Sequence, residues 1–360
     1  MSAWKYKRLT PKVIVSKLRL IDPAKLVDMS TKSLDAISSI LTETAYQPDI
    51  LNLSSPLDSL SLEHALISNF MRTYDEIADY SQREIRSLLL ALMMKFEANI
   101  VKSMLRAKEA NMSVDEALAY IIPVGRLSKA DCRKKLEKSR SVKDMAEAFS
   151  DMEYGYVLKK ALGENLEIRP LRRLESALDK YVYDGIWKAA AKLRGLDGKI
   201  ARTVLGIEID FLNVKVILRC KAMGISDQQI RRYLVPSSEV FAERDFENAM
   251  KAGDVKEIIE NLLTTAKLAM ARDHQYTLNS LLKEYENTHS FSCLGLLVDQ
   301  GLLKASLRMV KRYTPFFNIG SVLAFLNLKW FEIRNLRAIF RGIECNIPPH
   351  RIKKFLILPE

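Results

Sequence analysis

The chain has 360 residues, 48% of them hydrophobic and 28% charged, with a formal net charge of +12. This length and hydrophobic content predict a folded protein with a sizeable core. Uninterrupted apolar runs such as Leu88 to Met94 are far too short for a bilayer-spanning helix of about 20 residues, and the basic start MSAWKYKRLT has no secretory pattern. We therefore expect a soluble or peripheral protein.

The positive charge predicts an anionic partner, and nucleic acid, an acidic protein surface and an anionic membrane face all satisfy it. The cysteines at 132, 220, 293 and 345 form no C-x-x-C pair, so we expect reduced thiols in a cytosolic compartment. Charge and cysteine usage alone do not choose the partner.

In chain order, an amphipathic run around Val13 to Leu18 is followed by a turn at Asp22-Pro23. Similar short helical patterns then occur at Leu34–Tyr46, Val142–Tyr154 and Val255–Ala266. Each precedes a helix with a leucine-containing signature: Leu62-Glu-His-Ala-Leu66, Leu174-Glu-Ser-Ala-Leu178 and Leu278-Asn-Ser-Leu-Leu282. Gly and Pro are few and strand-like alternation is rare, so the sequence predicts an all-α fold.

One longer pattern occurs three times without an internal gap. The copies are FEANIVKSMLRAKEANMSVDEALAYIIP from Phe96, IDFLNVKVILRCKAMGISDQQIRRYLVP from Ile209 and FEIRNLRAIFRGIECNIPPHRIKKFLIL from Phe331. So many coincidences in register predict a threefold internal repeat of roughly 120 residues per copy. The predicted repeat domains are residues 1–127, 128–239 and 240–360.

Each copy predicts a helix, a tight turn and a second helix. In the second copy the first helix ends at Gly224, since glycine accepts positive φ without steric cost. Ser113–Glu116 and Ser226–Gln229 have the spacing of a capping box. The third copy instead has Asn346 followed by Pro348-Pro349, and proline is tolerated in the first turn of a helix.

An acidic residue recurs on the apolar stripe of each first helix. Its two interpretations are a catalytic acid and a buried structural group paired with a recurring arginine or asparagine. Acid and arginine would lie on opposite faces of one helix, so any such pair must join different helices. Recurrence in all three copies favours the structural role. The acids are Glu97, Asp210 and Glu332, the arginines Arg106, Arg219 and Arg341, and the asparagines Asn213 and Asn335.

No sequence pattern predicts a catalytic, cofactor-binding or metal-binding site in this chain. The four histidines, at 64, 274, 289 and 350, have no metal-ligand spacing. Gly195-Leu-Asp-Gly-Lys199 lacks the spacing and preceding strand of a phosphate loop, and a helix break explains it better. We expect no catalytic site, no cofactor and no metal.

Basic pairs recur in two copies, as Arg231-Arg232 and Lys353-Lys354, where the first copy has Leu118-Ala119. A solvated face is the simpler interpretation. The alternative is a contact with a partner that lacks threefold symmetry. We predict that these four residues contribute to partner contacts.

The three copies, together with the SLDAISSILTETAY-type segments, resemble the C subunit of archaeal A-type and bacterial V/A-type ATPases, whose counterpart in the eukaryotic V-ATPase is the d subunit. The resemblance covers essentially the whole chain. It is most specific in the E-x-x-N-L-x-x-I-x-R core of the third copy, at Glu332, Asn335, Leu336, Ile339 and Arg341. The first copy departs from this core, with Ile100 in the place of the asparagine.

The resemblance implies a funnel-shaped body of three similar helical domains. It implies a non-catalytic rotor component on the cytoplasmic face of the membrane, present in one copy. Such a component links the proteolipid ring to the D and F subunits of the central stalk, and transmits torque for ATP synthesis or hydrolysis and ion transport.

Two other functions remain open on sequence alone. A basic helical scaffold that binds nucleic acid would account for the charge. The common helical repeats that bind RNA, however, are shorter than the repeats predicted here. A helical enzyme with an unrecognised site is the second alternative, and Asp210 would be its first candidate residue.

Overall fold

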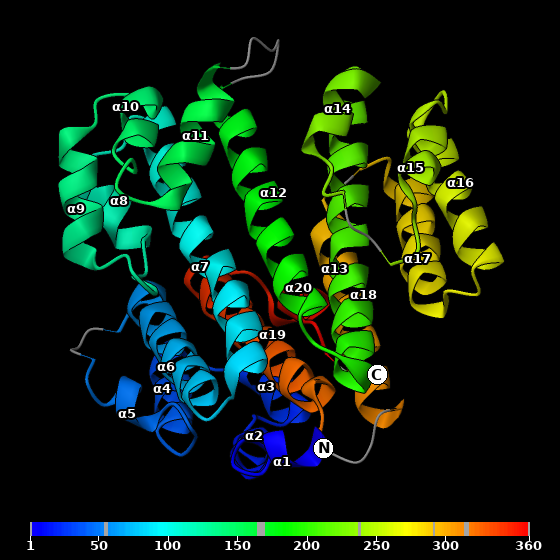
Figure 1. The fold of residues 1–360 in the computed structure, drawn as a ribbon. Helices are drawn as coiled ribbons and strands as arrows, with labels where there is room; N and C mark the ends of the chain where they lie inside the picture. The colour runs from blue at the N-terminus through cyan, green and yellow to red at the C-terminus, as the bar shows by residue number, and fades with distance from the viewer. Residues whose placement is uncertain are drawn as a thin grey trace. The chain divides into compact units, whose positions relative to one another are not determined.

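The computed structural model describes residues 2–53, 57–163, 170–236, 239–290, 292–312 and 317–358. Twenty helices, α1 to α20, lie in these ranges (Figure 1). The described residues form no β-strand, and a single isolated bridge joins Val124 and Leu127. The prediction of an all-α protein is confirmed. No helix in the described part of the chain is long and apolar enough to cross a membrane.

The helices belong to two compact units, each assembled from separate stretches of chain. The first consists of Met1–Arg86, Leu193–Arg219 and Ser238–Glu360, and the second of Ser87–Lys192 and Cys220–Ser237. The repeat domains 1–127, 128–239 and 240–360 remain a prediction, since these units group helices by packing and not by sequence similarity.

The first unit contains the beginning and the end of the chain. Its helices include α1 (Ser2–Lys5), α2 (Leu9–Leu18), α3 (Pro23–Met29), α4 (Leu34–Leu41), α5 (Gln47–Ile50), α6 (Ser59–Asp79), α15 (Glu243–Met250), α16 (Val255–Leu268), α17 (Arg272–Thr288), α18 (Leu294–Arg312), α19 (Ile319–Glu344) and α20 (Pro349–Lys354). Figure 1 shows α19 beside the early helices, which it contacts at α2, α3 and α6. The ring centroids of Phe70 and Trp330 lie 5.4 Å apart in this core.

The second unit contains α8 (Val114–Tyr120), α9 (Lys129–Lys138), α10 (Val142–Glu147), α11 (Glu153–Gly163), α12 (Pro170–Ala191) and α14 (Asp227–Tyr233). Two long helices, α7 (Arg83–Glu109) and α13 (Gly195–Ala222), begin in one unit and end in the other.

Each copy of the long sequence pattern folds as a helix, a tight turn and a helix, as predicted. The three turns have the same geometry. Positive φ occurs at Asn111 (52°), Gly224 (70°) and Asn346 (54°). The next backbone N–H closes each turn on a carbonyl five residues earlier: Met112 to Ala107 at 2.9 Å, Ile225 to Cys220 at 3.0 Å and Ile347 to Gly342 at 2.7 Å. This pattern satisfies carbonyls that the helix end would leave without donors.

The second helix of each copy begins in a different way. Ser113 and Glu116 form the predicted capping box at α8. Pro349 occupies the first turn of α20, also as predicted. The capping box predicted at Ser226 is wrong, because its side chain makes no cap hydrogen bond. The Gln229 N–H donates to the Ser226 backbone carbonyl at 3.0 Å instead.

Two predicted helices are shorter than their sequence patterns. The pattern at Leu34–Tyr46 is helical only to Leu41. The Thr42 and Thr44 hydroxyls donate to the carbonyls of Ser39 and Leu41, at 2.6 and 2.7 Å, and such bonds compete with helical ones. The pattern from Val142 is helical to Glu147 and resumes at Glu153. In the third copy, α16 extends from Val255 to Leu268 without interruption.

Candidate functional site

The three recurring acids are all buried, with exposures of 4% for Glu97, 0% for Asp210 and 4% for Glu332. A buried carboxylate is costly unless it is paired or hydrogen-bonded. Each acid is the centre of a separate cluster of donors, and each cluster lies within one unit.

Glu97 lies on α7 in the second unit. The Arg126 N–H donates to Glu97 Oε1 at 2.9 Å, while Arg126 Nη2 and the Tyr154 hydroxyl donate to Oε2 at 3.0 Å each. Burial and the Glu97 charge raise the pKa of Tyr154, so its hydroxyl remains a donor. The hydrogen bond to Glu97 raises the pKa of Arg126.

The turn before Arg126 depends on a glycine. Gly125 has φ +61°, and a Cβ built on it would lie 2.2 Å from Glu97 Oε1. A side chain at this position would displace the carboxylate and strain the backbone. Gly125 therefore allows the loop to bring the Arg126 N–H to the carboxylate.

Asp210 lies on α13 in the first unit. The backbone N–H groups of Glu239 and Val240 donate to its Oδ2 at 3.3 and 3.0 Å, and His274 Nε2 lies 2.8 Å from the same oxygen. An ionised carboxylate only accepts hydrogen bonds, so an ionised Asp210 would take this contact from an N–H on His274 Nε2. The His274 ring is stacked on Phe211, with centroids 5.1 Å apart. Asp210 Oδ1 has no partner among the described residues.

Glu332 lies on α19, also in the first unit. The Ile21 N–H donates to Oε2, and the Tyr46 hydroxyl donates to Oε1 at 2.7 Å. Lys329, one helical turn earlier, donates to Oε1 at 3.0 Å, and its ammonium lies 3.7 Å from the centroid of the Tyr46 ring. Burial lowers the pKa of Lys329, against the opposing effect of Glu332, and burial raises that of Tyr46.

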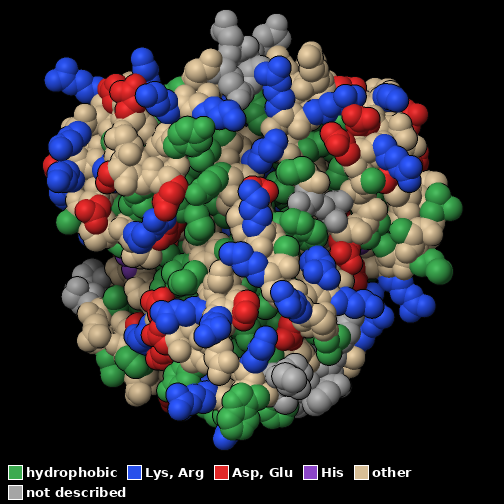
Figure 2. All heavy atoms as spheres, viewed as in Figure 1, with side chains coloured by type: hydrophobic (Ala, Val, Ile, Leu, Met, Phe, Trp, Pro, Cys, Tyr) green, Lys and Arg blue, Asp and Glu red, His purple; other side chains and the backbone are tan. Residues whose placement is uncertain are grey.

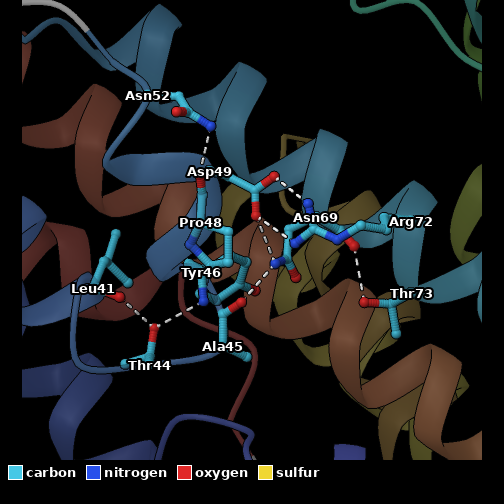
Figure 3. Close-up of polar contacts among 10 residues, drawn as sticks. All are labelled: Leu41, Thr44, Ala45, Tyr46, Pro48, Asp49, Asn52, Asn69, Arg72 and Thr73. Carbon is cyan, nitrogen blue, oxygen red and sulfur yellow. Dashed lines mark hydrogen bonds and ion pairs between the residues drawn. The ribbon is translucent and has the colours of Figure 1, made fainter.

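Local hydrogen bonds fix the segment that carries Tyr46 (Figure 3). Asn69 Nδ2 on α6 donates to the Ala45 carbonyl at 2.7 Å and to Asp49 Oδ2 at 2.9 Å. Arg72 binds both oxygens of Asp49 at 2.8 Å. This network attaches the segment to α6 on both sides of Tyr46, and so positions its hydroxyl for Glu332.

The three clusters follow one plan. A backbone N–H from a loop binds each carboxylate, and Arg126 and Glu239 occupy the same position relative to their acids. For Glu332, the backbone N–H comes from Ile21. Tyr46 and Tyr154 occupy matching positions in their segments, while His274 has this role for Asp210. In terms of the predicted repeat domains, Glu97 and Asp210 each bind a side chain of the next domain, Tyr154 and His274, and Glu332 binds Tyr46 in the first domain.

The recurring arginines do not bind these acids. Arg106 on α7 pairs with Glu175 on α12. Arg341 on α19 pairs with Glu63 on α6 at 2.7 Å. Glu63 and Glu175 are the second residues of two leucine-containing signatures, and the third signature has Asn279 there. Arg219 is exposed.

The two asparagines are buried. Asn335 binds the backbone of Ile357 in both directions, by Nδ2 to the carbonyl at 2.8 Å and from the N–H to Oδ1 at 2.7 Å. It therefore fixes the segment after α20. The basic pairs Arg231-Arg232 and Lys353-Lys354 are exposed on α14 and α20.

The sequence interpretation missed the groups that bind the acids: Arg126, Tyr46, Tyr154, His274 and Lys329. Lys329 had a local signal, since it is one helical turn from Glu332. The two tyrosines end the matched segments Leu34–Tyr46 and Val142–Tyr154. His274 carries no local signal, because only the fold brings α17 to Asp210. Among the described residues, no group of three or more His, Cys, Asp or Glu side chains could hold a metal ion.

These features define a class of protein: an all-α chain of helical hairpins in which buried acids bind loops and helices distant in sequence. The model of the ATP synthase (C/AC39) subunit family matches residues 9–355. The chain therefore belongs to this family.

Relatives named as the C subunit of an A-type ATP synthase agree with this assignment. The one from Methanocaldococcus jannaschii is 26% identical over 354 residues, covering 98% of this chain and 86% of the relative. Those from Methanosphaera stadtmanae and Methanothermobacter thermautotrophicus are 27% and 26% identical, covering 84% and 94% of this chain and 76% and 84% of the relatives.

Proposed function

We propose that the chain is the non-catalytic central-stalk component of a rotary A/V-type ATPase. In this role it joins the proteolipid ring to the D and F subunits of the stalk, and transmits torque between the ion-driven ring and the ATP-handling head. It would act as a single copy on the cytoplasmic face of the membrane, without a cofactor of its own.

The observation that carries the proposal is the extent of the family match. The family model spans residues 9–355, and the first relative aligns over 98% of this chain and 86% of itself. The likeness therefore extends over nearly the whole of this chain and is not confined to one part of it. The names of the relatives place them in an ATP synthase.

The clusters around the acids are consistent with a mechanical role. Each carboxylate is bound by backbone and side-chain donors from segments far along the chain. Bonds of this kind, with a charged acceptor, are worth about 1.5–3 kcal/mol each. A protein that transmits torque needs such internal stiffness, because a compliant coupling would dissipate rotation as deformation.

The proposal is tested by purifying the tagged chain from gently solubilised native membranes and identifying the accompanying proteins by mass spectrometry. Proteolipid, the D and F subunits and the catalytic head should be recovered together. A tagged, unrelated soluble protein of the same cells is the control. Recovery of nucleic acid and ribosomal proteins without ATPase components would overturn the proposal in favour of the scaffold alternative.

A further inference from the structure

The beginning of the chain is strongly basic. Residues 2–21 contain six Lys or Arg residues and no acidic residue, and the first acid is Asp22. One of the six, Lys12, forms an ion pair with Glu76 on α6. The side chains of Lys5, Arg8, Lys17 and Arg19 are exposed.

Helix α2 has two apolar faces, of which one is buried and the other exposed. Leu9 and Val13 are buried at i, i+4 spacing and attach the helix to its unit. Pro11, Ile14, Val15 and Leu18 have i, i+3, i+4, i+7 spacing, which forms a single stripe. All four are exposed, and Leu18 most of all at 80%. A helix that only covers a core would carry polar residues here.

Cations border this exposed stripe. At 100° per residue, Arg8 and Arg19 lie on one side of it and Lys17 lies on the other. Trp4 on α1 adds a large ring that is 71% exposed, with the Lys7 ammonium 4.6 Å from its centroid. Figure 2 shows green hydrophobic side chains beside blue Lys and Arg at its lower edge, where Figure 1 labels α1 and α2.

An anionic bilayer surface matches both properties of this surface, its exposed apolar stripe and the cations beside it. Aliphatic side chains and tryptophan enter the boundary between headgroups and acyl chains, and flanking cations contact the phosphates. Nucleic acid would use the cations, but an exposed aliphatic stripe gains little from a phosphate backbone. An acidic protein surface would match the charge, but nothing in it requires a Trp and a leucine this exposed.

We propose that the N-terminal strip, formed by α1 and the exposed face of α2, binds the surface of a bilayer that contains anionic phospholipid. The inference deepens the proposed function, and it rests on that function for the location, since a protein seated on a proteolipid ring lies beside the bilayer. Binding to lipid itself requires no other protein.

The test is co-sedimentation of the full chain with vesicles of phosphatidylcholine, alone or with phosphatidylglycerol at 30 mol%. The chain should bind the mixed vesicles, bind phosphatidylcholine weakly, and dissociate as salt increases. Lys17→Glu/Arg19→Glu should lower the partition coefficient at least about tenfold, since each basic residue near such a surface is worth about 1 kcal/mol. Leu18→Ser should weaken binding at every salt concentration.

A matched control makes the same charge change elsewhere. Lys134→Glu/Lys138→Glu alters α9, whose exposed face carries no large apolar side chain, and it should bind within about twofold of the unmodified chain. All of these side chains are exposed, so circular dichroism and the Tm should not change.

Absence of binding by the unmodified chain would overturn the inference, and so would equal losses in the α9 control. If Lys17→Glu/Arg19→Glu bound vesicles normally but lost proteolipid in detergent extracts, the strip would be a protein contact instead. Vesicle binding without recovery of ATPase components from membranes would contradict the proposed function and leave the lipid inference intact.

Discussion

Lys329 and Glu332 form a buried pair, with both side chains 3–4% exposed. Burial lowers the pKa of Lys329, while Glu332 opposes that shift. A buried pair of this kind adds little net stability over apolar residues, yet removal of one partner is expensive. The pair matters for the fold because Glu332 also binds Ile21 and Tyr46.

We predict that Glu332→Ala lowers the free energy of unfolding by about 3–5 kcal/mol, because it leaves the Lys329 ammonium buried without its counter-ion. Urea denaturation followed by circular dichroism measures the change. The matched control is Lys329→Met/Glu332→Leu, which removes both charges and should recover the part of the loss that comes from the unpaired ammonium, while the Ile21 N–H and the Tyr46 hydroxyl remain without their acceptor. An equal loss in the single and double variants would show that the charge of Lys329 is not the cause.

At the scale of elements, the turn residues of the three hairpins are equivalent. Positive φ costs an L-residue other than Asn or Asp about 1 kcal/mol or more, and the chain has Asn, Gly and Asn there. The turn therefore needs a residue that tolerates the left-handed region, and glycine is one solution.

Gly224→Ala is predicted to destabilise the protein by about 1 kcal/mol, because nothing near the position compensates for the strained φ. Gly185→Ala, in the middle of α12, is the opposite case: φ is ordinary there and a Cβ would meet nothing within 4 Å. It should stabilise by about 0.5–1 kcal/mol through helix propensity. Denaturant midpoints test both, and a gain from Gly224→Ala would refute the account of the turn.

The carboxylates of the capping boxes predict that the stability of the folded protein depends on pH. Hydrogen bonds from the Ser128 side chain and backbone lower the pKa of Asp131 at the beginning of α9. A carboxyl with a lowered folded-state pKa adds stability above its unfolded pKa, and that stability is lost as pH falls through the folded value.

The Tm of the unmodified chain should therefore exceed that of Asp131→Asn at pH 7, and the difference should disappear in acid, below the ordinary pKa of 3.8. Thermal scans from pH 7 to about pH 2 measure it, because the scan must pass below the lowered folded-state pKa. Lys138→Gln, a surface change in the last turn of the same helix without a cap contact, should show a difference that hardly varies with pH. If the Tm difference between the unmodified chain and Asp131→Asn stayed constant with pH, the proposed link between the Asp131 pKa and stability would be wrong.

At the scale of the whole molecule, the acids connect each copy of the pattern to the next. Glu97 binds Arg126 and Tyr154, Asp210 binds Val240 and His274, and Glu332 returns to Ile21 and Tyr46. The threefold repeat remains a prediction of the sequence pattern.

The exposed basic pairs lead to a prediction about assembly with partner proteins. Reversal of all four charges, at Arg231, Arg232, Lys353 and Lys354, should leave the Tm almost unchanged, since exposed charges contribute little to folding. It should reduce recovery of the proteolipid and stalk proteins in the membrane purification. Full recovery with the four charges reversed would remove these residues from the partner contacts.

Local sequence patterns predicted the all-α fold, the three helix–turn–helix stretches and the buried positions of the acids. These properties follow from local periodicity, turn residues and the cost of exposing apolar side chains, which are all visible in a short window. The resemblance to the ATPase family depended on the same local pattern, and the family match confirms it.

The groups that bind the acids depend on tertiary packing. Arg106 and Arg341 were expected near them, but they pair with Glu175 and Glu63 on other helices. The actual donors include His274 and Ile21, which lie far from their acids along the chain. No spacing rule predicts such pairs, because the choice depends on which loops and helices the packing brings to a buried carboxylate.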